Sequence, residues 1–300
     1  MKSSKARSAA VLFAVIGSVI VLGGQTLAAT TTVNLGTADP FAVLAYSLVT
    51  NIPTSAIIGN VGLSPAAGSN YSGLTALEVT GTIYAVDGTG PIGATNNPGL
   101  LTTAKNDLTT AYTDASGRTG ATVLTGGDNQ LGGKTLTPGV YSFSHATTAN
   151  LTAASPLTLS GNGVFIFQAS SDLITASASH INLINGAQAC NVFWTVPSSA
   201  SSIGTNSFFV GTIMAYSSIN LMTGANVQGR VLAQTAAVTL DHNTITRPAT
   251  CLATNYIAAG TPNTGFGVKS VNHVRGVAIL TISAVSLIAF AIYSRRLASK

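Results

Sequence analysis

The sequence predicts a mainly β protein, built as a discontinuous, three-faced β-solenoid with one long α-helix packed alongside. The first observation is that charged residues make up 7% of the chain, against roughly 25% in ordinary soluble domains. Thr, Ser, Ala, Gly and Asn take their place, and this mixture suits strands and tight turns. Second, only one segment between residues 30 and 251 has a helical period. Third, the segments that follow it repeat loosely along the chain.

The first 29 residues are predicted to be a secretory signal peptide. A basic start with Lys2, Lys5 and Arg7 precedes an apolar run over residues 9–22, and the small-residue stretch TLAA follows. This order is typical of a signal peptide that is cleaved within the small-residue stretch. The alternative is an uncleaved anchor helix, for which the apolar run is short.

The exported body is expected to form one solenoid domain over residues 30–255. Its first section, from about residue 33 to 65, is predicted to form strands and turns. The strands are expected to be interrupted at Pro53, Gly59, Gly62 and Pro65. Because strands come first, then a helix and then coils, the solenoid is predicted to be discontinuous in sequence.

The helix is predicted over about residues 98–116. Pro98 suits the first turn, and Gly117 ends the pattern. Apolar and small residues recur every three or four positions, at Leu101, Ala104, Leu108, Ala111, Tyr112 and Ala115. An amphipathic helix needs a surface to cover, so we expect it to pack along one face of the solenoid.

After the helix, four apolar tetrads each follow a small residue. They are VFIF after Gly163, NVFW after Cys190, TIMA after Gly211 and RVLA after Gly229. Aligning the last two on their glycines places Ile203 over Leu221, Thr205 over Thr223, Ser207 over Ala225 and Phe209 over Val227. A repeat of about 18 residues fits one coil of three short strands, with successive coils about 4.8 Å apart.

The C-terminal end is predicted to hold the protein at the cell surface. Residues 276–293 form an uncharged apolar stretch that just spans a bilayer, and a basic tail to residue 300 follows it. The positive tail belongs on the cytoplasmic side, so the body is expected outside the cell.

The linker, residues 256–275, contains the sequence PNTG with Pro262, Thr264 and Gly265. Its position before an apolar span and a basic tail resembles a sortase cell-wall sorting signal. Thr261 stands where that signal usually has Leu. Attachment to the wall by sortase and a plain membrane anchor therefore both stay open, and either gives an extracellular, surface-anchored protein.

Two cysteines, Cys190 and Cys251, lie in the exported body, where an oxidising environment favours a bridge. A structural disulfide is favoured over two free thiols. No metal site is expected, because the cysteines form no CxxC pair and have no His nearby.

The formal net charge of +5 does not indicate a nucleic-acid partner. Eight of the thirteen basic residues lie in the terminal segments, which leaves five basic against eight acidic residues in the body, and 5 − 8 = −3. A domain with this balance lacks the positive surface that binds phosphates.

We expect neither enzyme activity nor a cofactor. Glycoside cleavage needs two facing carboxylates, but the acidic residues Glu78, Asp87, Asp128, Asp172 and Asp241 share no phase in the repeat. No zinc-protease, serine-hydrolase or nucleotide-binding motif occurs. A carbohydrate-active enzyme is the alternative if Asp172 and Asp241 face each other within about 10 Å.

The outward rows of the coils suggest an unusual partner. Thr holds a methyl and a hydroxyl in one restricted position, and the coil spacing of about 4.8 Å and the two-residue strand step of roughly 6.8 Å lie near oxygen repeats in hexagonal ice. We therefore predict a flat, charge-poor face that adsorbs to ice or ordered water, on a strand that carries residues 223–226 and its neighbours. Its candidate residues are Thr175, Ser177, Thr205, Ser207, Thr223, Asn226 and Thr244.

Several long stretches of the body resemble the secreted ice-binding proteins of microbes. They include LGTADPFAVLA from residue 35, DLTTAYTDASGRT from residue 107, INLINGAQACNVFWTV from residue 181 and VTLDHNTIT from residue 238. The resemblance implies a triangular solenoid whose flat face adsorbs to ice through Thr, then Ala or Gly, any residue, and Thr or Asn.

The sequence TGAN at residues 223–226 fits that pattern, whereas TNSF at 205–208 and TASA at 175–178 depart from it. The leading hypothesis is a non-enzymatic ice-binding surface protein. The alternative is a surface adhesin or wall-associated module on the same scaffold that binds glycan or another surface.

Overall fold

The computed structural model describes residues 31–124, 130–143, 149–248 and 251. The predicted signal peptide, the linker with Pro262, Thr264 and Gly265, and the predicted membrane segment all lie outside these residues. Within the described ranges, no helix is both long and apolar enough to cross a bilayer.

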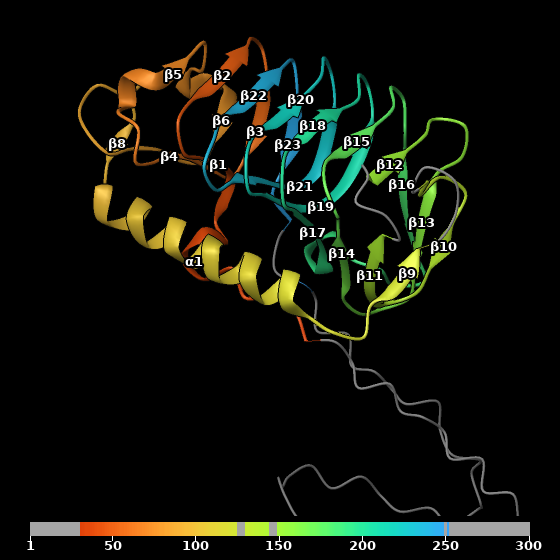
Figure 1. Cartoon of the computed structure of the whole chain (residues 1–300). Coiled ribbons are helices and arrows are strands. Elements are labelled where there is room, and N and C mark those ends of the chain that lie inside the picture. Colours follow the sequence, from red (N-terminus) through yellow and green to blue (C-terminus); the bar gives the residue numbers. More distant parts are fainter. Residues whose placement is uncertain (1–30, 125–129, 144–148, 249–250, 252–300) are drawn as a thin grey trace, which may run out of the picture. The chain divides into compact units, whose positions relative to one another are not determined.

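The described body is a three-faced solenoid of parallel strands, with one helix beside it (Figure 1). Face 1 consists of β9 (Thr122–Leu124), β11 (Gly139–Phe143), β14 (Phe165–Gln168), β17 (Val192–Val196), the second halves of β19 (Phe208–Ala215) and β21 (Asn226–Ala233), β1 (Phe41–Ala45), β4 (Asn60–Leu63), β7 (Ile83–Ala85) and β8 (Thr95–Asn96). Face 2 consists of β10 (Thr135–Leu136), β13 (Leu157–Ser160), β16 (Ile181–Ile184), the first halves of β19 and β21, β23 (Thr244–Thr246), β3 (Ala56–Ile58) and β6 (Val79–Thr80). Face 3 consists of β12 (Ala149–Leu151), β15 (Leu173–Thr175), β18 (Ala200–Ile203), β20 (Ile219–Leu221), β22 (Val238–Asp241), β2 (Val49–Ile52) and β5 (Tyr71–Ser72).

The stacking order confirms the predicted discontinuity. The last C-terminal coil lies next to the first N-terminal strands, because β21 pairs with β1, β22 with β2 and β23 with β3. The N-terminal coils therefore close one end of the solenoid. The chain then crosses back along face 1 as the helix before it begins the coils of the other end (Figure 1).

The predicted alignment of the two most regular coils is confirmed. Gly211 pairs with Gly229 and Phe209 with Val227 in β19 and β21. Both strands bend from face 2 to face 1 at these glycines. A Cβ on Gly229 would lie 1.8 Å from the carbonyl oxygen of Gly211, so this close approach of two backbones requires glycine.

The first two tetrads are in register with each other, since Phe165 pairs with Val192, but they are out of the predicted phase with the last two. Phe193 pairs with Thr212, so Val192, and not Cys190, lies beside Gly211. A short 3₁₀ helix, η5 (Ala189–Asn191), comes before β17. Other 3₁₀ turns are η1 (Gly36–Ala38), η2 (Gly68–Asn70) and η3 (Ala76–Glu78).

The interior of the solenoid is filled by stacked ladders of apolar side chains. Four aromatic rings form the largest ladder, with centroid distances of 5.4 Å from Tyr141 to Phe167, 4.0 Å from Phe167 to Trp194 and 5.2 Å from Trp194 to Phe209. The Trp194 Nε1 donates a 3.0 Å hydrogen bond to the carbonyl of Val210. The aromatic ladder thus fixes four consecutive coils in register.

The helix, α1 (Pro98–Gly117), confirms the prediction and ends one residue later than expected. Asn97 caps its first turn by accepting from the Leu100 N–H at 3.0 Å. The side chain of Gln168 on face 1 donates to the carbonyls of Ala115, Ser116 and Arg118 at the other end. The five buried helix residues are Leu101, Ala104, Leu108, Ala111 and Ala115, and they cover face 1.

Candidate functional site

Faces 2 and 3 are the two that the helix leaves uncovered. Strand β22 of face 3 ends on a charged residue, Asp241, whereas the described strand segments of face 2 carry none. On face 2, Asn226 pairs with Thr244, and two residues further along the same strands Gln228 pairs with Thr246. These four side chains are partly or fully exposed, whereas Val227 and Ile245 between them are buried. Side chains alternate between the two sides of a strand, so two rows of polar side chains point outward from face 2.

Both rows continue beyond these two coils. The first row runs from His180 through Phe208, Asn226 and Thr244 to Ala56. The second row runs from Gln228 and Thr246 to Ile58 and Thr80. At the opposite end of face 2, Thr135, Thr158 and Asn182 form a matching aligned row.

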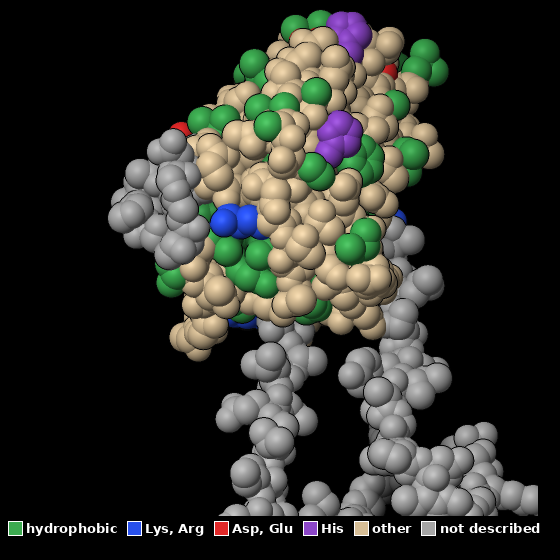
Figure 2. Space-filling model, turned by 90° about the vertical axis from the view of Figure 1, so that its right-hand side faces the viewer, with side chains coloured by type: hydrophobic (Ala, Val, Ile, Leu, Met, Phe, Trp, Pro, Cys, Tyr) green, Lys and Arg blue, Asp and Glu red, His purple; other side chains and the backbone are tan. Residues whose placement is uncertain are grey.

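Face 2 is also free of charge within its described strands. Their outward residues are Ala, Ile, Val, Phe, His, Ser, Thr, Asn and Gln, without an Asp, Glu, Lys or Arg. The end of the solenoid that faces the viewer in Figure 2 likewise shows few acidic or basic side chains. A charged group would organise its own hydration shell. Because the described strands of face 2 have none, the polar side chains in the rows determine how water is arranged there.

Ser177, Thr205 and Thr223 lie at the corner between faces 3 and 2. Each comes directly before a residue with positive φ, namely Ala178, Asn206 and Gly224. Backbone bonds stack the three, since Ala178 N–H donates to Thr205 at 2.8 Å and Asn206 N–H to Thr223 at 3.0 Å. The prediction that residues 223–226 form one strand is wrong: Thr223 and Gly224 make a turn, and β21 begins at Asn226.

Two candidate residues, Thr175 and Ser207, point into the protein and cannot contact an outside surface. Both side chains are 2% exposed. Thr175 ends β15 on the inward side and its Oγ1 accepts from the Gly204 N–H at 2.8 Å. Ser207 follows the positive-φ residue Asn206 and turns inward, as Ala225 does one coil later. The row member in the coil of Thr175 is therefore Ser177.

The corner row ends at a charged residue, Asp241. Thr223 Oγ1 donates to one of its carboxylate oxygens, and His242 Nδ1 lies 2.5 Å from the other. The hydrogen bonds from Thr223 and His242 hold the pKa of Asp241 below its ordinary value. Because its hydroxyl is bound to Asp241, Thr223 contributes mainly its methyl group to the corner surface.

The carboxylates that an enzyme would need are not brought together. Asp172 comes just before β15, at the corner of faces 1 and 3, while Asp241 ends β22 at the corner of faces 3 and 2. Two further strands, β18 and β20, lie between them. Asp172 is instead bound by Ser201 Oγ at 2.8 Å.

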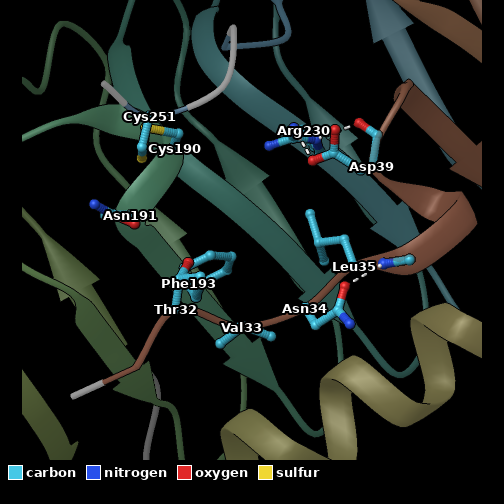
Figure 3. A pocket seen from close by; sticks show the side chains of 11 residues that line it. Thr32, Val33, Asn34, Leu35, Asp39, Cys190, Asn191, Phe193, Arg230 and Cys251 are labelled. Carbon is cyan, nitrogen blue, oxygen red and sulfur yellow. Dashed lines mark hydrogen bonds and ion pairs between the residues drawn. A yellow bond between two sulfur atoms is a disulfide. The ribbon is translucent and has the colours of Figure 1, made fainter. Parts of the chain in front are cut away.

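The predicted disulfide between Cys190 and Cys251 is confirmed, with a Cα–Cα distance of 5.6 Å. It borders a pocket of about 300 Å³ between η5 and the N-terminal segment before η1 (Figure 3). Across the pocket, the buried Arg230 pairs with Asp39 at 2.6 Å. The disulfide and the ion pair attach both ends of the described chain to the coils. Neither of them involves the outward rows of face 2.

The outward rows lie on a fold that other proteins share. A family model described as ice-binding-like matches residues 43–246 of this chain. The chain belongs to this ice-binding-like family.

Several members of the family are similar over most of the chain. An ice-binding protein of Flavobacterium frigoris is 43% identical over 227 residues, which cover 75% of this chain and 79% of the relative. One from a Colwellia species is 39% identical and covers 83% and 96%. Among solved structures, an ice-binding protein domain of Shewanella frigidimarina has a TM-score of 0.65 at 33% identity, covering 74% of this chain and 99% of the other.

The candidate residues cover only part of the outward surface of face 2. Thr135, Thr158, Asn182, Gln228 and Thr246 were not among the candidates, although they line face 2. Thr246 and Gln228 were accessible to reasoning, because each lies two residues beyond a predicted site residue on the same strand.

Proposed function

We propose that this protein binds ice through face 2. The observation that carries the proposal is the pair of aligned outward rows, Asn226 with Thr244 and Gln228 with Thr246, on an uncharged face that no helix covers. Membership of the ice-binding-like family supports it, as do the relatives named ice-binding proteins.

The geometry of the rows suits a lattice of ordered water. Neighbouring coils repeat at about 4.8 Å, and outward positions along a strand at roughly 6.8 Å. Hydroxyl and amide groups at this spacing hold the first layer of water in fixed positions. The methyl groups of Thr restrict the other positions that these water molecules could take. The backbone holds the array before contact, so adsorption costs little ordering entropy.

Adsorption itself supplies the activity, and no bond is made or broken. A protein held on the ice surface forces ice to grow as curved fronts between adsorbed molecules, which lowers the freezing point below the melting point. The same adsorption slows the transfer of water from small crystals to large ones.

The test compares one substitution on each uncovered face. Thr244→Tyr places a bulky ring in the middle of face 2, and Thr239→Tyr places the same ring on face 3, where Thr239 pairs with Thr50 in the outward row. We expect Thr244→Tyr to reduce the gap between freezing and melting points about tenfold, because the ring keeps the flat face from contacting ice.

The control Thr239→Tyr should keep wild-type activity and wild-type ice-crystal shape. Equal activity of wild type and Thr244→Tyr would reject face 2 as the contact surface. Activity lost only in Thr239→Tyr would assign adsorption to face 3.

We also propose that the protein is displayed outside the cell, anchored by residues 276–293 or by sortase at Thr264. The support is the order of the sorting-like motif, apolar span and basic tail in the sequence. Deleting residues 276–300 should move the protein from the cell fraction to the medium, and an unchanged cell-bound fraction would contradict this.

A further inference from the structure

The corner between faces 1 and 3 carries a row of large side chains that adsorption through face 2 does not use. Tyr216 follows β19, Gln234 follows β21 and Tyr46 follows β1, which are neighbouring strands of face 1. The Gln234 N–H donates to the Ala215 carbonyl at 2.9 Å, which fixes Gln234 beside Tyr216. We call Tyr216, Gln234 and Tyr46 the tyrosine strip.

The two tyrosines of the strip are open to solvent. The exposed fraction is 53% for Tyr216 and 39% for Tyr46, in a body where large apolar and aromatic side chains are otherwise mostly buried. Since one strand separates them, the backbones of the two tyrosines are about two strand spacings apart, roughly 9–10 Å. This arrangement presents two aromatic surfaces in line along the solenoid axis.

Between them, Gln234 holds a donor without an acceptor. Its side chain is 8% exposed, and its Nε2 has no hydrogen-bond partner among the described residues. A buried N–H group without a partner is destabilising, and such groups are rare in native proteins. An acceptor from a bound molecule would remove this destabilisation.

The helix α1 supports the strip from behind. The Lys105 Nζ lies 5.3 Å from the centroid of the Tyr46 ring and donates to the carbonyls of Ala233 and Gln234 at 2.6 and 2.9 Å. On the same helix, burial first and Tyr216 second raise the pKa of the half-buried Tyr112. Because Lys105 is committed to these carbonyls, the strip offers aromatic faces and an amide rather than a free charge.

These groups select a class of ligand. Aromatic rings stack on the apolar C–H faces of sugar rings, and an amide donates to a hydroxyl or ring oxygen, so a few placed polar groups set the orientation. Phosphate and sulfate polymers need clustered Lys and Arg, which the strip lacks.

We propose that the tyrosine strip binds a neutral polysaccharide, with sugar rings stacked on Tyr46 and Tyr216 and the Gln234 amide bound to an oxygen between them. In a three-faced solenoid the corner of faces 1 and 3 lies opposite face 2. A molecule adsorbed to ice through face 2 therefore keeps the strip turned away from the ice and free to hold a glycan. Glycan binding itself does not depend on the proposed ice binding.

Electrophoresis of the native protein through gels that contain dextran, mixed-linkage β-glucan or galactomannan tests the proposal. At least one of these neutral polysaccharides should retard the wild-type protein. The double variant Tyr46→Ala/Tyr216→Ala should lose the retardation, whereas Ile92→Ala, which removes a 96% exposed apolar side chain elsewhere, should keep it.

The single variant Gln234→Leu tests the same site if the double variant fails to fold. It replaces an unpartnered amide by an apolar group of similar size, so the melting temperature should not fall, while the affinity for the polysaccharide should drop about tenfold. Ice-crystal shaping by the same variants separates the two sites, because strip variants should retain it.

Three results would overturn the proposal. The first is migration of the wild-type protein that none of the three polysaccharides slows. The second is equal retardation of the wild type and both strip variants. The third is stronger retardation by heparin or RNA than by any neutral polysaccharide, which would assign the strip to an anionic polymer.

Discussion

At the scale of single residues, two hydroxyls buried next to the outward surface should behave in opposite ways. Thr175 accepts a hydrogen bond from the buried Gly204 N–H, whereas Ser207 Oγ has no partner among the described residues. Thr175→Val leaves the Gly204 donor unpaired and should lower the free energy of unfolding by about 1–3 kcal/mol. Ser207→Ala should change it little or raise it.

Urea unfolding of both variants measures this difference, and ice-crystal shaping by each should match wild type because neither side chain reaches the surface. Loss of shaping in a folded Ser207→Ala variant would contradict the inward orientation of this residue.

A second prediction at this scale concerns Glu78, whose side chain links the turn after β2 with the 3₁₀ turn η3. Its carboxylate accepts from Asn51 Nδ2 and Ser55 N at 2.8 Å and from Thr75 N at 2.9 Å. Burial raises the pKa of Glu78, but the hydrogen bonds from Ser55, Thr75 and Asn51 together bring it below the ordinary value. The stabilisation is therefore present above the unfolded pKa of about 4.3 and disappears as pH falls through the lower, folded pKa.

Glu78→Gln should reduce the free energy of unfolding at pH 7 by about 1–3 kcal/mol. The deficit should shrink as the pH is lowered below about 4, and chemical unfolding at a series of pH values measures it. A deficit that stays constant with pH would mean that the carboxylate charge does not carry the stabilisation.

The same scale explains which candidate residues could be predicted. Asn226 and Thr244 were predicted to lie outward on neighbouring coils, and they pair with each other on face 2. Thr175 and Ser207 were misplaced because Ala178 and Asn206 adopt positive φ at the corner, which resets the inward and outward alternation. Ala178 carries no signal for such a turn, whereas Asn206 carries a weak one, because Asn adopts positive φ more readily than most residues.

At the scale of elements, the attachment of α1 depends on its C-terminal end. Gln168 Nε2 bonds three carbonyls there, which would otherwise lack partners. Gln168→Ala should lower the free energy of unfolding by about 1–3 kcal/mol and speed amide exchange in the last helical turn and the segment after it. Thr109→Ala, on the exposed side of the same helix, is the matched control and should be neutral or stabilising.

Elements were predictable where a period was long and unbroken. The helix followed from the spacing of Leu101, Leu108 and their neighbours, and β19 and β21 from two coils of equal length. The strands β10, β13 and β16 were not placed on a face, because their coils differ in length. Coil length, and not strand propensity, limited the prediction.

At the scale of the whole molecule, the solenoid separates its surfaces. The helix covers face 1, the uncharged rows lie on face 2, and the tyrosine strip lies at the corner opposite. The order of the coils could be predicted only in outline, because the pairing of β21 with β1 joins segments more than 180 residues apart and no local pattern encodes such a contact.

The measurement that tests ice binding by face 2 most directly is the fraction of protein taken up by a slowly growing ice hemisphere. We predict that wild type and the face 3 variant Asn220→Tyr/Thr239→Tyr enter the ice, while the face 2 variant Asn226→Tyr/Thr244→Tyr stays in the liquid. Equal uptake of all three folded proteins, or exclusion of the wild type, would contradict the account.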